Sequence, residues 1–464
     1  MLKRIQKLLT AWMVGVSTLL ICNQTVSAAE PAGTNRVVVM ISVDGLAGFY
    51  FDDPKAEMPT IRELASQGAH ASAMKAVAPT VTWPNHTTLV TGVTPAKHGV
   101  VGNNYFDRVA GRRVTLIADP EFDKDQIVKV PTVYDLAKAN GLKTAAIRWP
   151  ATRNARTLDW TIPDMAMPAL IKNSTPSLIA KLERSGLRLD SPHRNGEEMD
   201  SLCTEILNRI LEVHRPELAL FHIINVDHVQ HGKGPRTAEA YAAIKAADQQ
   251  VRAVWEELKH DYPGRATLFV VSDHGFSPVR RTILPNVVLR QAGLLASDEK
   301  SNQKIEVVVQ GGCAMIYVRD VAQRTEILKK VREAFAAVSG VKIVGVKDFK
   351  SYGVADPKDD PHAPDLLLFA DEGSAFGSTA SGDAAFKDKP ETSGTHGHDP
   401  HLPDLHAMFV AWGAGIKPGV QLGEISNTSV APTIARLLNL KLPDADGPVL
   451  KKILADKSSV SGKQ

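Results

Sequence analysis

The hydrophobic pattern of the chain consists of short, continuous apolar runs separated by longer amphipathic stretches. Helical stretches are expected at Thr60–Gln67, Val133–Ala139, Met199–Val213 and Thr237–His260. Apolar runs without alternation are typical of parallel strands that are covered on both faces. The alternation predicts an α/β fold with helices on both faces of a central, mostly parallel sheet. The five candidate strands are Val37–Val43, Thr144–Ile147, Leu218–Ile224, Thr267–Val271 and Ala407–Ala411.

A second α/β pattern lies between Phe276 and Ser393. It has a helical stretch at Ala322–Val338 and a tract rich in Gly, Ser and Asp, Asp371–Lys389, which indicates a surface loop. Its strand-like segments are Lys304–Val309, Ala314–Val318 and Pro364–Phe369. We interpret residues 276–393 as a smaller lobe inserted into one core, whose two parts are residues 29–275 and 394–464.

Residues 1–28 have the three-part pattern of a secretory signal peptide. A basic start, Met1–Lys7, is followed by the mostly apolar run Leu8–Cys22 and then by small residues up to Ala29. The apolar run is shorter than the roughly 20 residues that a membrane span needs, although an uncleaved anchor is the alternative. We expect cleavage near Ala28, export to the periplasm and no stable membrane insertion afterwards.

The formal charge of +3 comes from this first segment, so the mature chain would hold 51 basic and 51 acidic residues. Such a balance argues against broad electrostatic binding of nucleic-acid polymers. Two of the three cysteines, Cys203 and Cys313, would remain after cleavage. Export permits a disulfide between them, and the sequence leaves both the bridged and the reduced form open.

Acidic residues follow three of the predicted strands, at the end where open α/β sheets place their sites. Asp44 follows the first strand, and Asp227 and His231 follow the third. Asp273 and His274 follow the fourth. One acid at a strand end is often a helix cap, but three acids with two histidines are a stronger signal. Carboxylate oxygens and imidazole nitrogens suit zinc, so these residues are candidate metal ligands.

A segment rich in histidine precedes the last predicted strand. Four histidines lie between His396 and His406, a pattern that fits either metal binding or a polar loop. His396 is flanked by Gly394 and Gly397, and glycine gives the backbone the freedom to direct this side chain inward. His396 is therefore a further candidate ligand.

Two prolines bracket the hydroxyl-rich segment Pro79–Pro84. Proline disfavours a helix at the residue before it, so a helix is expected to begin only after Pro84. Thr82 then lies in a loop before a helix N-terminus, where unpaired N–H groups and the helix dipole favour an anion. That position suits a hydroxyl that attacks a phosphorus or sulfur centre. A Thr-rich helix cap is the alternative interpretation.

Six segments keep a specific order along the chain: Val43–Gly45, Pro79–His86, His98–Asn103, Asp227–Pro235, Ser272–Gly275 and Thr395–Asp399. By these segments the chain resembles the nucleotide pyrophosphatase/phosphodiesterase branch of the alkaline phosphatase superfamily. The resemblance extends from Val37 to about Leu450. Trp149-Pro150 also resembles a turn of that branch. The resemblance implies a three-layer α/β/α fold and hydrolysis of phosphodiester or pyrophosphate bonds in a small, nucleotide-like phosphate ester.

The resemblance further implies two zinc ions. One ion would be held by Asp227, His231 and His396. The other would be held by Asp44, Asp273, His274 and the hydroxyl oxygen of Thr82.

The resemblance also implies a covalent phospho-threonine intermediate. Thr82, and not Thr80, matches the nucleophile, and Asn103 matches the residue that donates a hydrogen bond to a phosphoryl oxygen. Trp83 stands where many relatives carry Phe, and His398 where Tyr or Phe is usual. We expect Trp83 and Asn103 to bind the substrate, with Trp83 in contact with the leaving group.

An alkaline phosphomonoesterase on the same scaffold is the first alternative. Monoester specialists need extra cations for the additional phosphate charge. The threonine-type monoesterases that resemble this branch carry Lys-x-Arg for this purpose, and none occurs between Leu142 and Asp159. Arg148, Arg153 and Arg156 keep the alternative open.

A phosphonoacetate-type hydrolase, which shares all the ligands, is a second alternative. The lack of a Cys-x-Pro-x-Arg segment argues against a sulfatase. A non-catalytic metal-binding protein is a distant alternative, because the chain keeps Thr82 and Asn103 beside six candidate ligands. The oligomeric state and the physiological substrate do not follow from the sequence.

Overall fold

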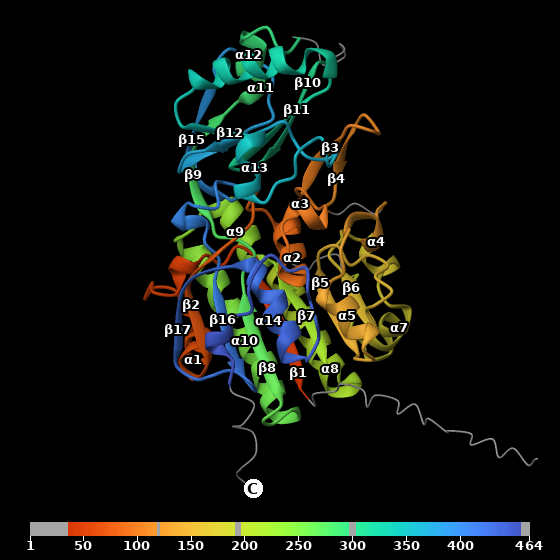
Figure 1. Ribbon diagram of the computed structural model, residues 1–464. Helices are drawn as coiled ribbons and strands as arrows, with labels where there is room; N and C mark the ends of the chain where they lie inside the picture. Colours follow the sequence, from red (N-terminus) through yellow and green to blue (C-terminus); the bar gives the residue numbers. More distant parts are fainter. Residues whose placement is uncertain (1–35, 118–120, 191–195, 297–302, 456–464) are drawn as a thin grey trace, which may run out of the picture.

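A computed structural model describes residues 36–117, 121–190, 196–296 and 303–455. Its largest element is an eight-stranded sheet with the order β17-β2-β16-β8-β1-β7-β5-β6 (Figure 1). The strands are β1 (Val37–Val43), β2 (Ala69–Lys75), β5 (Thr144–Trp149), β6 (Trp160–Pro163), β7 (Leu218–Ile223), β8 (Ala266–Val271), β16 (Phe409–Gly413) and β17 (Val420–Ser426). Only β16 runs against its neighbours in this sheet, so most pairs are parallel.

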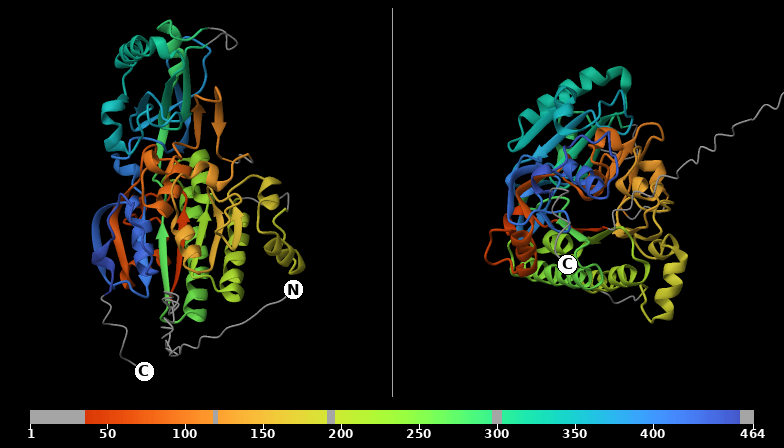
Figure 2. Two further views of the ribbon diagram at one scale, coloured as in Figure 1. Left: turned by 45° about the vertical axis from the view of Figure 1, so that its right-hand side comes forward. Right: turned by 60° about the horizontal axis from the view of Figure 1, so that its bottom comes forward.

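The eight-stranded sheet is the middle of three layers. Alternate residues of β1 point to opposite faces, so that Val39 and Ile41 join one hydrophobic cluster and Val38 and Met40 join the other. The first face is covered by α1 (Pro59–Gln67), α7 (Pro176–Arg184), α8 (Gly196–His214) and α10 (Ala238–Asp261), and the second by α2 (Thr82–Thr91), α5 (Val133–Ala139) and α14 (Val430–Leu437) (Figure 2). This arrangement confirms the predicted three-layer α/β/α fold with a mostly parallel sheet.

A smaller antiparallel sheet, with the order β10-β11-β13-β12, stands beyond one end of the large sheet (Figure 1). Its strands are β10 (Ile305–Gln310), β11 (Cys313–Val318), β12 (Val341–Gly345) and β13 (Leu366–Ala370). One face packs on α11 (Pro285–Gln291) and α12 (Arg324–Ala336). The other packs on α13 (Val346–Tyr352) and on the hairpin of β3 (Asn104–Asp107) and β4 (Arg112–Thr115). Residues 276–393 remain our proposed inserted lobe, and the β3–β4 hairpin packs on it from outside that range.

A third, three-stranded sheet connects the two larger ones. It has the order β14-β9-β15 and consists of β9 (Ser277–Ile283), β14 (Gly373–Phe376) and β15 (Phe386–Thr395). The prediction of a loop over Asp371–Lys389 is therefore wrong, because β14 and the start of β15 lie there. Their composition does not favour strands, and both are formed by pairing with β9, a tertiary contact that overrides local propensity.

Two details of the large sheet differ from the expected pattern. The apolar run Ala407–Ala411 was expected to be parallel, but β16 pairs antiparallel with both β8 and β2. A strand covered on both faces has the same apolar run whether it is parallel or antiparallel to its neighbours, so the run does not indicate the direction of the strand. The sequence does not predict the edge strands β6 and β17, nor β2, the neighbour of β17, and exposed positions interrupt the apolar pattern of β2 and β17.

Cys203 and Cys313 do not form a disulfide, because they are buried in different hydrophobic clusters, in α8 and β11. No helix in the described ranges is long and apolar enough to cross a membrane. The predicted signal peptide, residues 1–28, lies outside the described residues. The remaining α-helices are α3 (Pro95–His98), α4 (Lys124–Ile127), α6 (Ala169–Lys172) and α9 (Asn225–Lys233).

Candidate active site and metal centre

Three carboxylates meet at the carboxyl ends of β8, β1 and β7, which are adjacent in the large sheet. Asp44 directly follows β1, Asp273 follows β8, and Asp227 lies in α9, which begins just after β7. Asp44 and Asp273 are buried, whereas the Asp227 side chain is 14% exposed. Neighbouring parallel strands thus bring together acids that are far apart in the sequence.

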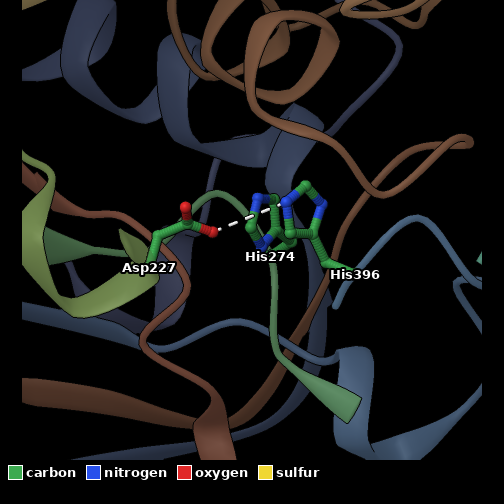
Figure 3. Close-up of side chains that lie close together, drawn as sticks. All are labelled: Asp227, His274 and His396. Atoms are coloured by element: carbon green, nitrogen blue, oxygen red, sulfur yellow. Dashed lines mark ion pairs between the residues drawn. The ribbon is translucent and has the colours of Figure 1, made fainter. Parts of the chain in front are cut away.

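The first group of side chains surrounds Asp227. Its Oδ1 lies 3.5 Å from Nε2 of His396 (Figure 3). Its Oδ2 lies 3.4 Å from Nε2 of His231. The Nε2 atoms of these two histidines are 3.2 Å apart. The His231 side chain is 42% exposed, so this group is open to solvent on one side. These three residues are the predicted ligands of one ion.

The second group surrounds Nε2 of His274. This atom lies 3.1 Å from Oδ2 of Asp273 and 3.4 Å from Oδ1 of Asp44. The rings of His274 and His396 stack with their centroids 3.8 Å apart, which joins the two groups (Figure 3). The structure therefore brings all six predicted carboxylate and imidazole ligands into one site.

Four buried polar atoms in this site have no hydrogen-bond partner: Asp44 Oδ1, Asp227 Oδ1, Asp273 Oδ2 and His274 Nε2. Buried polar atoms are almost always paired, so four unpaired atoms that face one another need an explanation. Each belongs to a group that ligates divalent cations. Cations placed among them would satisfy all four, and the donor set therefore fits a metal centre.

The histidines have a shared orientation that supports this fit. Each uses Nδ1 toward a backbone carbonyl oxygen: His274 toward Gly275 at 3.0 Å, His396 toward Thr80 at 3.0 Å and His231 toward Gly394 at 3.3 Å. An Nδ1–H that donates in this way leaves Nε2 as a lone-pair acceptor. Acceptor nitrogens that face carboxylate oxygens repel unless a cation lies between them, and such carbonyl contacts are usual for metal-bound histidines.

The electrostatics of the site show the same need for positive charge. Burial, followed by the charge of Asp227, raises the pKa of Asp44 well above its usual value. Burial, followed by the charge of Asp44, does the same for the pKa of Asp273. Burial also lowers the pKa of His274 to about 3. The protein by itself thus disfavours the charged forms of Asp44, Asp273 and His274, and a bound cation would reverse this for the two carboxylates.

His222 was not identified as a site residue from the sequence. It lies within β7, with Nε2 3.0 Å from Oδ2 of Asp44 and Nδ1 3.0 Å from the backbone oxygen of Arg148. His222 thus contacts one carboxylate oxygen of Asp44, Oδ2, while the other, Oδ1, faces the two donor groups. A single histidine inside an otherwise apolar buried strand was the one available signal, and it does not reveal the partner.

Thr82 lies at the first position of a helix and not in a loop before one. Helix α2 starts at Thr82, so the expectation of a helix only after Pro84 is wrong. Pro84 lies in the first turn, where a missing N–H removes no helical hydrogen bond. The Thr82 hydroxyl makes no hydrogen bond to the described residues, whereas its carbonyl oxygen lies 2.9 Å from Nδ1 of His86. That atom is 3.4 Å from Asp273 Oδ2, so the start of α2 lies beside the candidate metal site.

Thr80 connects two loops instead of facing the site. Its hydroxyl donates to the carbonyl oxygen of His398 at 2.9 Å and accepts from the N–H of Gly397 at 3.0 Å. Its own carbonyl oxygen holds Nδ1 of His396. Thr80 therefore fixes the segment that carries a candidate ligand, in agreement with a structural role.

Asn103 lies beside the start of α2. Its Oδ1 accepts the backbone N–H of Trp83 at 2.8 Å, which fixes the orientation of its amide. The Nδ2 group makes no hydrogen bond to the described residues and is left to donate to a ligand. The Trp83 side chain is only 5% exposed and packs in the cluster shared with the smaller sheet. This burial leaves little of its ring for contact with a leaving group.

The other histidines near the last strand lie outside the two donor groups. His398 is fully buried, with Nε2 2.8 Å from the backbone oxygen of Ser374. His401 contacts Asp399, with Nδ1 2.6 Å from Oδ1. Of the four histidines between residues 396 and 406, only His396 joins the donor groups.

Comparison with known proteins gives a family. The model of the type I phosphodiesterase/nucleotide pyrophosphatase family matches residues 38–399. An uncharacterized pyrophosphatase/phosphodiesterase of Schizosaccharomyces pombe is 25% identical over 444 residues, which span 89% of this chain and 80% of that protein. A venom phosphodiesterase of Crotalus durissus collilineatus is 24% identical over 439 residues. That match spans 92% of this chain and 47% of the relative, so the chain spans about half the length of the venom enzyme.

Solved structures share the fold. Human ectonucleotide pyrophosphatase/phosphodiesterase 5 has a TM-score of 0.70 at 20% identity, covering 91% of this chain and 100% of that chain. The murine protein, in an inactive threonine-to-alanine variant in complex with AMP, has a TM-score of 0.68 at 19% identity, covering 90% and 100%. With a family model that covers most of its length, the chain belongs to the type I phosphodiesterase/nucleotide pyrophosphatase family of the alkaline phosphatase superfamily.

Proposed function

We propose that the chain is a two-zinc phosphodiesterase or nucleotide pyrophosphatase that acts through a covalent phospho-Thr82 intermediate. The observation that carries the proposal is the set of four unpaired ligand atoms beside the N-terminus of α2. Asp227, His231 and His396 would hold one ion, and Asp44, Asp273, His274 and the Thr82 oxygen would hold the other. Bound zinc supplies positive charge to the phosphoryl oxygens and lowers the pKa of an oxygen that it coordinates.

In the proposed reaction, the Thr82 hydroxyl loses its proton to solvent, and Oγ1 forms a bond to phosphorus while the bond from phosphorus to the leaving oxygen breaks. Water then cleaves the phosphothreonine and regenerates the hydroxyl. Asn103 donates from Nδ2 to a phosphoryl oxygen, a contact worth about 3 kcal/mol where such donors have been removed. The murine relative, in which an inactive variant replaces a threonine by alanine, supports a threonine nucleophile, and its bound AMP supports a nucleotide-like substrate.

The charges around the site support a diester over a monoester. No Lys or Arg of the described ranges makes an ion pair with the three site carboxylates. Arg148, the candidate cation, has a side chain that is only 15% exposed and that pairs with Asp164 at 3.3 Å. Arg153 pairs with Asp123 at 3.0 Å. A monoester carries an additional negative charge that rewards a free guanidinium, and those of Arg148 and Arg153 are both paired with carboxylates.

The deciding measurement compares kcat/KM for a nitrophenyl nucleotide diester with that for nitrophenyl phosphate. We expect the diester to be preferred, about two zinc ions per chain by elemental analysis, and loss of turnover on chelation. Full activity of metal-free protein would end the zinc proposal.

The role of Arg148 is tested with Arg148→Asn, because asparagine tolerates the positive φ of 57° at this position, and with Arg148→Lys as the variant that keeps the charge. We expect the same diester preference in both. A monoester preference in the wild type that disappears only in Arg148→Asn would favour the phosphomonoesterase alternative.

A further inference from the structure

We propose that Gln310, at the end of β10 in the smaller sheet, is a positioning residue for Asn103. The inference rests on the proposed function, because it concerns the donor to the phosphoryl oxygen. It assigns the smaller lobe a part in building the site: the lobe would set the orientation of a group that touches the substrate.

The contact between Gln310 and the Asn103 segment is direct and buried. Oε1 of Gln310 accepts the backbone N–H of Asn103 at 2.7 Å and that of Asn104 at 3.4 Å. At its other end, Nε2 donates to Sδ of Met315 at 2.9 Å, on the adjacent strand β11. Gln310 is 6% exposed. A side chain that is fixed at both ends and buried has few other rotamers, so it can hold its partner in one place.

The backbone contact determines the direction of the Asn103 amide. With its main chain fixed by Gln310, Asn103 reaches the N–H of Trp83 with Oδ1 at 2.8 Å. Since a backbone N–H requires an acceptor, this contact forces Nδ2 to the opposite side as the donor. Loss of the Gln310 contact would leave the Asn103 N–H unpaired and allow the amide to rotate away from this arrangement.

The turn at residues 310–312, which begins with Gln310, also contacts a candidate metal ligand. The N–H of Gly312 donates to the carbonyl oxygen of His396 at 2.8 Å. Gly311 has a φ of +64°, and a Cβ on it would lie 2.2 Å from that oxygen, so only glycine allows the approach. The turn is fixed to its own lobe by the N–H groups of Phe376 and Ala370, which donate to Gly311 and Gly312. Residues 310–312 thus contact both the Asn103 segment and the His396 segment.

A double-mutant cycle separates positioning from a purely structural role. The variants are Gln310→Met, which keeps the size but removes both hydrogen-bonding groups, Asn103→Ala, and the two combined. We expect Asn103→Ala to lower kcat for the diester by roughly 100- to 1000-fold, and Gln310→Met to lower it by about 10-fold or more, since it acts through Asn103. In the Asn103→Ala background, Gln310→Met should cost less than about threefold.

The control is Gln323→Met, the same change at an exposed glutamine of the same lobe, whose Oε1 accepts from Lys304 at 3.1 Å. It should leave kcat, KM and zinc content unchanged. If Gln310→Met does not fold, as judged by its melting temperature, the cycle is repeated with Gln310→Asn, which withdraws the amide by one carbon.

Losses that multiply in the double variant would overturn the proposal, because they would assign Gln310 a structural role independent of Asn103. An unchanged kcat in Gln310→Met would overturn it as well. A wild type with no diesterase activity would instead refute the proposed function. If the wild type and the Asn103→Ala variant behave as expected, an unexpected result for Gln310→Met contradicts only the role proposed for Gln310.

Discussion

The histidines of the site illustrate how one residue type acquires different roles. His231, His274 and His396 each direct Nδ1 to a backbone carbonyl oxygen and Nε2 toward carboxylate oxygens. His222 has the same type of carbonyl contact, but its Nε2 lies against the outer oxygen of Asp44. The difference is one of position: three rings lie inside the donor groups, and His222 lies behind them, in the middle of a strand.

Substitutions of Thr82 and Thr80 test the proposal that Thr82 is the nucleophile. Thr82→Ala should lower kcat by roughly 1000-fold or more, because removal of a covalent nucleophile leaves only the binding groups. Thr82→Ser should keep a measurable rate, since the hydroxyl remains. The measurement is single-turnover kinetics with a diester substrate, followed by mass analysis for a phosphorylated chain.

Thr80→Ala serves as the matched control for this test. It removes the hydroxyl that joins Gly397 and His398, which should cost about 1–3 kcal/mol of stability and lower the melting temperature. The carbonyl oxygen that holds His396 remains, so activity per folded molecule should stay within a few-fold of the wild type. A greater loss of activity in Thr80→Ala than in Thr82→Ala would show that the nucleophile is misassigned.

Among the helices and strands, the sequence predicts well those whose hydrophobic pattern follows from burial alone. β1 and β8 are covered on both faces, so every position is buried, nearly every residue is apolar, and the strand can be predicted from hydrophobicity alone. β15 is not predictable in this way, since Phe386–Thr395 is polar and forms a strand only by pairing with β9. The start of α2 fails for a local reason, because proline is tolerated in a first turn.

The candidate ligands follow the same logic. Residue type and position after a strand are enough to select Asp44, Asp227 and Asp273, because the carboxyl ends of neighbouring parallel strands meet. His222 and Gln310 are not predictable, since their roles depend on contacts across 178 and 207 residues of sequence. Trp83 is a different case: its position beside Thr82 predicts substrate contact, and the structure buries most of the residue in the hydrophobic cluster of the smaller sheet.

The segment that follows His396 is held to the smaller lobe by Asp399. Its Oδ2 lies 2.6 Å from Nζ of Lys342 in β12 and 3.1 Å from the hydroxyl of Tyr352 in α13. Burial alone would raise the pKa of Asp399, but hydrogen bonds from Lys342 and His401 outweigh burial and lower it. The ionised form therefore stabilises the fold, and the contribution is present above the unfolded pKa of about 3.9 and is lost as the pH falls through the lower folded pKa.

Asp399→Asn should reduce the free energy of unfolding by about 1–2 kcal/mol at pH 7, since Lys342 is more than half exposed and its charge is partly screened. The difference from the wild type should shrink below about pH 4. Denaturant unfolding at several pH values, with chelator present in both proteins, measures this without any contribution from release of a metal. Asp383→Asn, whose side chain is 95% exposed, is the control. A difference that is constant with pH would contradict the assignment.

At the largest scale, the proposed inserted lobe and the rest of the chain share a hydrophobic cluster. The β3–β4 hairpin comes before α5 in the chain, but Tyr105, Phe106 and Val114 are buried in the cluster of the smaller sheet, together with Trp83. The segments of Asn103 and His396 lie between the lobes and are contacted by both. Changes in the relative placement of the lobes are therefore expected to act directly on the site.

Metal removal should lower the stability of the whole chain. Asp44, Asp227 and Asp273 converge at the ends of three central strands, and without cations their charges repel and four buried atoms remain unpaired. A ligand that binds only the folded state at 1000 times its Kd stabilises that state by about 4 kcal/mol. We therefore expect a melting temperature several degrees lower in chelator than in zinc, measured by scanning calorimetry.

Asp273→Asn makes this prediction sharper. Asparagine keeps an oxygen that can accept the N–H of Gly45, as Asp273 Oδ1 does at 3.2 Å, but removes one of the three converging negative charges. In chelator, the variant should melt at a higher temperature than the wild type, because less repulsion is buried. In zinc the order should reverse, because the variant has lost a charged ligand. A wild-type melting temperature that is the same in zinc and in chelator would show that these carboxylates are not held together by metal, and the assignment of the site as a metal centre would then fail.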